Sequence, residues 1–219
     1  MMNKVKVTFF VFVLVSILDI VGIIFEIPIL IYIFKPLIIL SLLFLYVFSL
    51  PKRLKWYVIA LGFSFFGDVL LMFSGELFFI FGLVSFLIAH LLFIKIVLTR
   101  IQKYALSKII FSIIPFLIVF SLLLFILKNS LNEMFVPVVI YGFTISTFGA
   151  VSLLDYLNGK SSKSLLMLLG AIVFIVSDSV LAINKFYNPT HLNEVIIMAT
   201  YISSQYLIFR SMILETESE

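Results

Sequence analysis

Two aspartates and a lysine lie inside long apolar stretches of this sequence, where charged side chains are rare. Asp68, Asp178 and Lys35 are each surrounded mainly by leucine, isoleucine, valine and phenylalanine. A charged group at membrane depth costs about 2.5 kcal/mol or more on insertion scales, and by default it marks a functional site. Such groups can exchange protons with a substrate or bind an ion, so this set is the candidate centre of any chemistry.

Four other residues in the apolar stretches could belong to the same site. Tyr141 falls at a depth similar to that of the three charged groups, in the outer half of the membrane, and His90 falls nearer the middle. Tyr201 and Gln205 are four residues apart, so they share one face of a helix. We predict that Asp68, Asp178, Lys35 and Tyr141 line one cavity, with His90 and Gln205 at its floor.

Structural roles are the alternative for each of these residues. A buried carboxyl group can pair with a lysine or a hydroxyl group, and Lys35 can extend its amine to the outer interface. Histidine, tyrosine and glutamine side chains often hydrogen-bond between membrane helices. The acidic residues nearer the interfaces, Asp19, Glu26 and Asp155, are expected to be solvated.

The composition indicates which elements must hold these residues. Of the 219 residues, 63% are hydrophobic and 12% are charged, and the mean hydropathy is +1.29. Soluble domains carry roughly 25% charged residues, so lipid must be the solvent for most of these side chains. Apolar stretches of about 20 residues are typical of membrane-spanning helices, and lipid forces backbone polar groups to pair internally. The predicted fold is therefore an all-α, polytopic transmembrane helical bundle.

Eight spans are predicted, forming a single transmembrane domain over residues 1–214 with a short tail at 215–219. Turn signals separate the spans, for example Pro51-Lys52-Arg53 and Asn158-Gly159-Lys160. The first apolar run is too long for a signal peptide and no small-residue cleavage site follows it, so we expect it to be retained. The predicted spans are 6–25, 29–50, 55–73, 77–98, 107–127, 134–156, 164–186 and 192–213.

Asp68 and Asp178 also suggest an internal repeat. They lie 110 positions apart, in the third and seventh spans, and Gly67-Asp68-Val69-Leu70-Leu71 is similar to Ser177-Asp178-Ser179-Val180-Leu181. A parallel four-plus-four duplication would give both spans the same direction. Chance similarity between two apolar helices is the alternative.

Some functions are excluded by residue counts. There is no cysteine, which excludes disulfides, thiolate nucleophiles and thiolate metal sites, and two histidines are too few for a histidine-rich metal site. The net charge of +4 is better explained by membrane topology than by nucleic-acid binding. We expect no metal and no other cofactor.

Several short runs of the sequence form a recognisable set of motifs: 66–72, 82–90, 170–182 with Asn184-Lys185-Phe186, Lys35-Pro36-Leu37 and 201–205. They resemble the YhhN-like family, which contains the animal lysoplasmalogenases. The resemblance covers the whole chain, and the segment around Asp178 is its most specific part. Position 93 departs from the family, which often has tyrosine where this chain has Phe93.

The resemblance implies hydrolysis of the vinyl-ether bond of a lysoplasmalogen or a related ether lysolipid. The products would be a fatty aldehyde and glycerophospho-ethanolamine or -choline. Asp68 and Asp178 would be the catalytic acid and base, in either assignment, because protonating the vinyl ether needs an acid and stabilising the resulting cation needs a negative charge. Lys35 would bind the phosphate. The remaining substrate-binding residues would be His90, Tyr141, Asn184, Tyr201 and Gln205.

Two other classes of function fit the same residues. A small proton- or ion-coupled transporter would use the buried Asp/Lys set to bind ions or substrate, although paired glycine- and proline-interrupted spans are missing. A structural membrane subunit would have no site at all. The expected partner is a lysophospholipid or ether lipid from the bilayer, and self-association into a homo-oligomer is left open.

The distribution of basic residues predicts that both termini face the cytoplasm and that the protein lies in the cell membrane. Eleven lysines and arginines fall on one side of the predicted spans and two, Lys128 and Lys185, on the other. Reporter fusions at Glu219 and at Asn129 should therefore give signals from opposite sides of the membrane. If both report the same side, either the predicted number of spans or the predicted fifth span is wrong.

Overall fold

The computed structural model describes residues 2–101 and 105–217, and in these ranges the chain is helical with no strand. Eight α-helices follow one another along the sequence, in agreement with the eight predicted elements. A short 3₁₀ turn, Asn132–Met134, precedes the sixth helix. The α-helices are α1 (Met2–Ile24), α2 (Pro28–Ser49), α3 (Lys55–Leu70), α4 (Glu76–Arg100), α5 (Leu106–Leu127), α6 (Phe135–Gly159), α7 (Ser162–Phe186) and α8 (His191–Glu217).

Six of these helices are long and apolar enough to cross a membrane, which confirms an integral membrane protein of the polytopic helical class. The helices α3 and α8 are the two that fall short. α3 has 16 residues, fewer than the roughly 20 that a span usually needs. α8 has 27 residues, but polar side chains such as Ser203, Ser204 and Gln205 lower its hydropathy. Its last residues, 215–217, belong to the predicted tail but continue the helix, and the rest of that tail lies outside the described residues.

The chain forms two compact units. The first comprises residues 1–89 and 212–219, and the second comprises residues 90–211. The division falls inside α4, between Ala89 and His90, and not between α4 and α5. The units therefore do not coincide with the two halves of a four-plus-four duplication, which stays a prediction.

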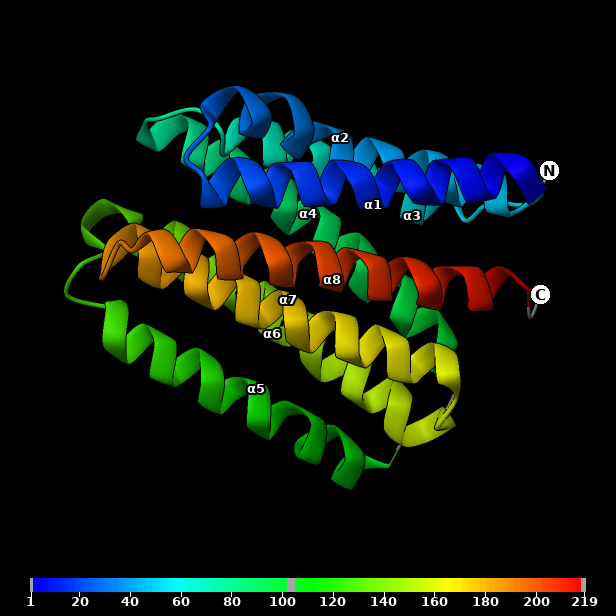
Figure 1. The fold of residues 1–219 in the computed structure, drawn as a ribbon. Coiled ribbons are helices and arrows are strands. Elements are labelled where there is room, and N and C mark those ends of the chain that lie inside the picture. Colours follow the sequence, from blue (N-terminus) through cyan, green and yellow to red (C-terminus); the bar gives the residue numbers. More distant parts are fainter. Residues whose placement is uncertain (1, 102–104, 218–219) are drawn as a thin grey trace. The chain divides into compact units, whose positions relative to one another are not determined.

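In the first unit, α1 and α2 pack side by side as an antiparallel hairpin (Figure 1). Pro28 lies in the first turn of α2. A backbone N–H at this position would have no acceptor within the helix, so the N–H that proline lacks removes no helical hydrogen bond. Gly22 lets the helices approach closely, because a Cβ atom there would lie 2.8 Å from Leu30 Cβ and 3.2 Å from the Ile31 backbone nitrogen. This contact determines the register of the hairpin.

In the second unit, α6 packs against both α5 and α7, and α7 packs closely on α8 (Figure 1). α7 begins with a capping box in which Ser161 and Ser164 each bond the other's backbone N–H. Gly170 brings α7 against α8, because a Cβ atom there would lie 3.2 Å from the Ile208 backbone nitrogen. The arrangement gives α6 two packing faces, one toward α5 and one toward α7.

A buried ion pair ties helix ends together in the second unit. Arg100, at the end of α4, lies 3.4 Å from the Asp155 carboxylate of α6, and the two side chains are 4% and 9% exposed. Arg100 also lies 3.4 Å from the hydroxyl of Ser211, which donates to the Lys163 carbonyl at 2.7 Å. The expectation that Asp155 is solvated was wrong, because a neighbouring cation allows a carboxylate to be buried near a helix end.

We predict that Asp155→Ala lowers the free energy of unfolding by about 3 kcal/mol, because it removes the carboxylate that is paired with the buried Arg100. Thermal unfolding of the purified protein in detergent measures this change. The double variant Arg100→Met, Asp155→Leu is the control and should be close to the wild type, because it removes both charges. A single variant as stable as the wild type would show that the pair contributes nothing.

Candidate functional site

The second unit contains a hydrogen bond between two of the predicted site residues. The hydroxyl group of Tyr141 on α6 donates a hydrogen bond to the carboxylate of Asp178 on α7. Tyr141 is buried and Asp178 is half-buried. The neighbouring Ser177 donates to the Ile197 carbonyl of α8 at 3.0 Å, which fixes α7 against α8 beside the carboxylate. Asp178 therefore lies on an anchored helix with one oxygen held by a phenol.

His90 lies beside this pair in an aromatic enclosure. The imidazole is fully buried, and its ring centroid lies 5.9 Å from that of Tyr141 and 4.5 Å from that of Phe174. The rings of Phe148 and Phe93 complete the enclosure, at 5.6 and 5.9 Å from the imidazole. Position 93, where the chain departs from the family's tyrosine, thus contacts the predicted site residue His90 directly.

Two residues of α8 extend the same cluster. Tyr201 packs its ring edge-on against Phe174, with the centroids 5.6 Å apart. Gln205, one helical turn further, is fully buried, and neither its amide nitrogen nor its amide oxygen hydrogen-bonds to the described residues. A buried amide with no partner is costly, by about 1–3 kcal/mol, so this side chain is available to bind a polar group.

Asn184 lies at the end of α7, where it has a structural contact. Its side-chain oxygen accepts a hydrogen bond of 2.8 Å from the backbone N–H of Thr190, in the turn that leads to α8. This bond orders the turn between the two helices. A role in substrate binding, expected from the family resemblance, stays a prediction.

The other two predicted charged residues belong to the first unit. Asp68 is 3% exposed, near the end of α3, and Lys35 is half-buried on α2. Burial of Asp68 agrees with a position inside the apolar stretch. The prediction that these two residues share a cavity with Asp178 and Tyr141 is not tested by the structure and stays a prediction.

The first unit also contains a buried carboxyl group that the sequence analysis placed in solvent. Asp19 has no exposed surface, and neither of its oxygens accepts a hydrogen bond from the described residues. The expectation that it is solvated was wrong, whereas Glu26 is exposed as expected. The sequence pattern that could have predicted this burial is a helical repeat on one face of α1. The buried residues of that face are Thr8, Phe12, Val15, Ser16, Asp19 and Ile23.

Lys35 is the charged group that acts on Asp19. The two interact electrostatically, and the hairpin register explains why. Gly22 lies opposite Ile31, so in an antiparallel pair the residue one turn earlier on α1 faces the residue one turn later on α2. Asp19 is thereby added to the candidate site residues of the first unit as a neighbour of Lys35.

Among the described residues, no three side chains of histidine, aspartate or glutamate are grouped as metal ligands would be. The polar groups of the second-unit cluster are instead a carboxylate, a phenol, an imidazole and an amide, enclosed by aromatic rings. This set can donate and accept protons in a site with little water, and ring faces can stabilise a positive charge.

Comparison with known proteins identifies one family. The YhhN family model matches residues 30–212 of this chain. Lysoplasmalogenase TMEM86A of Bos taurus is 25% identical over 167 residues, which are 71% of this chain and 64% of that protein. The chain thus spans less than two thirds of the length of this curated relative. No solved structure matches the chain.

We predict that Asp19→Leu raises the free energy of unfolding by about 1–3 kcal/mol, because a buried carboxyl group without hydrogen bonds is destabilising. Thermal unfolding in detergent is the measurement, and Asp19→Asn, which keeps a polar group of the same shape, should change little. Such a gain would indicate that the carboxyl group is retained for function. A loss of stability in Asp19→Leu would show instead that Asp19 and Lys35 form a structural pair.

Proposed function

The chain belongs to the YhhN family, and we propose that it is an integral membrane hydrolase that cleaves the vinyl-ether bond of a lysoplasmalogen or a related ether lysolipid. The family match and the likeness to a protein named a lysoplasmalogenase support this class of reaction. The observation that carries the chemistry is the hydrogen bond from Tyr141 to Asp178, next to a fully buried histidine in an aromatic enclosure.

Vinyl-ether hydrolysis begins with transfer of a proton to the carbon that is further from the ether oxygen. The electron pair of the double bond forms the new C–H bond, and the carbon next to oxygen becomes part of an oxocarbenium ion. Water adds to that carbon and loses a proton to a base, which gives a hemiacetal. The hemiacetal hydroxyl group then loses its proton as the C–O double bond forms, the bond to the glycerol oxygen breaks with its electron pair going to that oxygen, and the oxygen takes up a proton, so that a fatty aldehyde is released.

Asp178 is suited to the base and charge-stabilising role in this sequence. Its carboxylate accepts a hydrogen bond from the phenol hydroxyl group of Tyr141, an arrangement that orients the carboxylate and leaves its other oxygen available for water or for the cation. The ring faces of the enclosure favour a positive charge and exclude bulk water, which strengthens electrostatic interactions inside the site. The phenol and the carboxylate thus act as one unit.

His90 and Gln205 are proposed to position the reacting groups. The Gln205 amide makes no hydrogen bond to the described residues, so it can bind the attacking water or a glycerol hydroxyl group. His90 can bind the same groups or transfer a proton between them. Tyr201, which packs on Phe174, completes the aromatic wall on the α8 side.

Asp68 is proposed as the proton donor and Lys35 as the residue that binds the substrate phosphate. Asp68 is a buried carboxyl group, and a carboxyl group can act as the general acid that carbon protonation needs. Lys35 is half-buried, so its amine can reach an anionic group. The substrate is proposed to enter from the bilayer, which supplies lysolipids directly to a membrane-embedded enzyme.

We predict that Asp178→Asn and Asp68→Asn each lower kcat by about 10²–10⁴-fold, because asparagine keeps the shape but loses the titratable proton. Tyr141→Phe should lower kcat less, since the carboxylate remains but loses its orienting hydrogen bond. Aldehyde release from a lysoplasmalogen by purified protein is the measurement. Normal folding of each variant is checked by thermal unfolding.

The matched substrate control is the saturated alkyl-ether analogue, which cannot form an oxocarbenium ion by carbon protonation. It should compete for binding and release no product. Equal turnover of the two lipids, or full activity of either Asn variant, would reject the two-carboxylate mechanism. Uptake of a solute into sealed vesicles, without aldehyde release, would favour the transporter alternative.

A further inference from the structure

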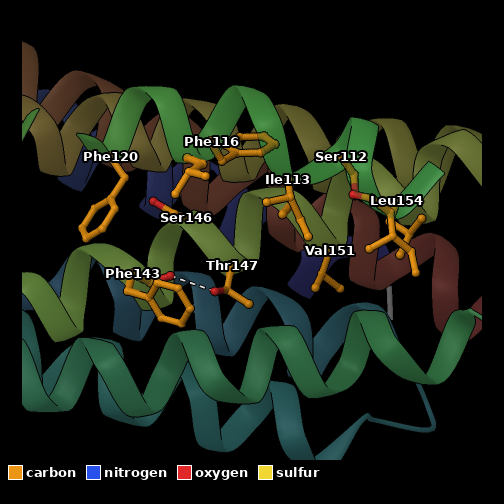
Figure 2. A pocket seen from close by; sticks show the side chains of 12 residues that line it. Ser112, Ile113, Phe116, Phe120, Phe143, Ser146, Thr147, Val151 and Leu154 are labelled. Atoms are coloured by element: carbon orange, nitrogen blue, oxygen red, sulfur yellow. Dashed lines mark hydrogen bonds between the residues drawn. The ribbon is translucent and has the colours of Figure 1, made fainter. Parts of the chain in front are cut away.

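A groove between α5 and α6 lies within the second unit and has a volume of about 360 Å³. Its walls are almost entirely apolar, and Figure 2 shows side chains of the two helices lining it from both sides. Several of its lining side chains are strongly exposed; Phe143, for example, is 62% exposed. In a membrane this groove faces lipid, and its volume is at the lower end of roughly 300–1,000 Å³ for ligand sites.

The length of the groove matches one leaflet of a bilayer. On α6 the lining residues extend from Phe143 to Leu154, and on α5 they extend from Ile109 to Phe120. Eleven residue steps at about 1.5 Å each give a length of about 16 Å. The hydrocarbon core of a bilayer is about 30 Å thick, so the groove is as long as one acyl chain in one leaflet.

A positive charge lies at one end of the groove. Lys108 immediately precedes the first lining residue of α5, Ile109. Its ammonium group donates to the Leu157 carbonyl at 3.0 Å and to the Asn158 side-chain oxygen at 3.1 Å, both at the end of α6. Lysine has three N–H donors, so one remains for an additional acceptor. Lys160 follows Asn158 by two residues in the sequence and carries a second positive charge.

We propose that the groove binds one anionic phospholipid, with an acyl chain between α5 and α6 and the phosphate at Lys108. A lipid whose chain fills a one-leaflet groove places its head group at the end of the groove, where the ammonium group is held by two hydrogen bonds. Charge complementarity selects a phosphate, and the positive surroundings disfavour a head group that carries its own ammonium. The lipid would also fill the groove that the packing of α5 against α6 leaves open.

This groove is separate from the proposed catalytic cluster. Tyr141 and Phe148 lie on the side of α6 that faces His90, whereas Phe143, Thr147 and Leu154 line the groove. At 100° per residue these two sets are about half a turn apart around the helix. The bound phospholipid is therefore a structural or regulatory partner and not the substrate.

Native mass spectrometry of the full-length protein in detergent tests the proposal. The protein is titrated with phosphatidylglycerol and with phosphatidylcholine of the same acyl chains. The test variants are Lys108→Ala and Thr147→Phe, which fills the groove with a ring. The matched controls are Lys6→Ala, an exposed lysine in the other unit, and Thr147→Val, which keeps the volume of the side chain.

The wild type should bind one phosphatidylglycerol more tightly than phosphatidylcholine. Lys108→Ala should weaken phosphatidylglycerol binding by about fivefold, the effect of one basic residue near a charged lipid. Lys108→Arg should restore it, which separates charge from packing. Thr147→Phe should weaken both lipids, and both controls should bind as the wild type does.

Equal affinity for the two lipids would overturn the role of Lys108, and so would wild-type binding by Lys108→Ala. Unchanged binding by Thr147→Phe would overturn the placement of the acyl chain. If Lys108→Ala does not fold, Lys108→Gln takes its place in the same titration. Because lipid retention is the readout, the result does not depend on whether the chain hydrolyses a lysoplasmalogen.

Discussion

The absence of water from the bilayer core is the constraint on which this structure depends. Every backbone N–H and C=O in a span must pair within the chain, and helices achieve this locally. The described residues are accordingly helical, and their outward faces are apolar. Polar side chains within the spans must then be satisfied by other side chains, by the backbone or by a ligand.

Three arrangements in the molecule show how differently that requirement is met. The Arg100–Asp155 pair is held by opposite charges and a nearby serine, and it connects helix ends. Asp178 is held by the phenol of Tyr141, which leaves part of the carboxylate available for other groups. The amide of Gln205 and the carboxyl group of Asp19 have no hydrogen bonds to the described residues. The first arrangement pairs opposite charges, whereas the others leave polar atoms without a hydrogen bond to the described residues, and these are the atoms to which binding or catalytic roles are proposed.

The two packing faces of α6 have different surroundings in the second unit. The face toward α4 and α7 places Tyr141 and Phe148 around His90, in a site enclosed by aromatic rings. The opposite face, toward α5, has small side chains such as Thr147 and Ala150 beside larger apolar ones, so a groove remains. The proposed catalytic cluster and the proposed lipid groove therefore lie on different sides of the same helix.

The sequence by itself determined the class of fold and most of the candidate residues. Long apolar runs specify membrane helices because hydropathy depends on composition alone, and Asp68 and Asp178 are conspicuous because charge in such runs is costly. Tyr201 and Gln205 could be assigned to one helix face because their spacing matches the helical repeat. The family resemblance rested on short motifs around these same residues, and the family match confirms it.

Only the tertiary structure decided which polar groups meet. Whether a residue near a helix end faces water or another helix depends on the rotation and close approach of neighbouring helices, which hydropathy does not encode. Gly22 brings α2 against the face of α1 that carries Asp19, and Arg100 covers Asp155, so both carboxylates are buried where the sequence indicated solvent. The Tyr141–Asp178 bond likewise joins residues 37 positions apart in sequence, and only the packing of α6 on α7 brings them into contact.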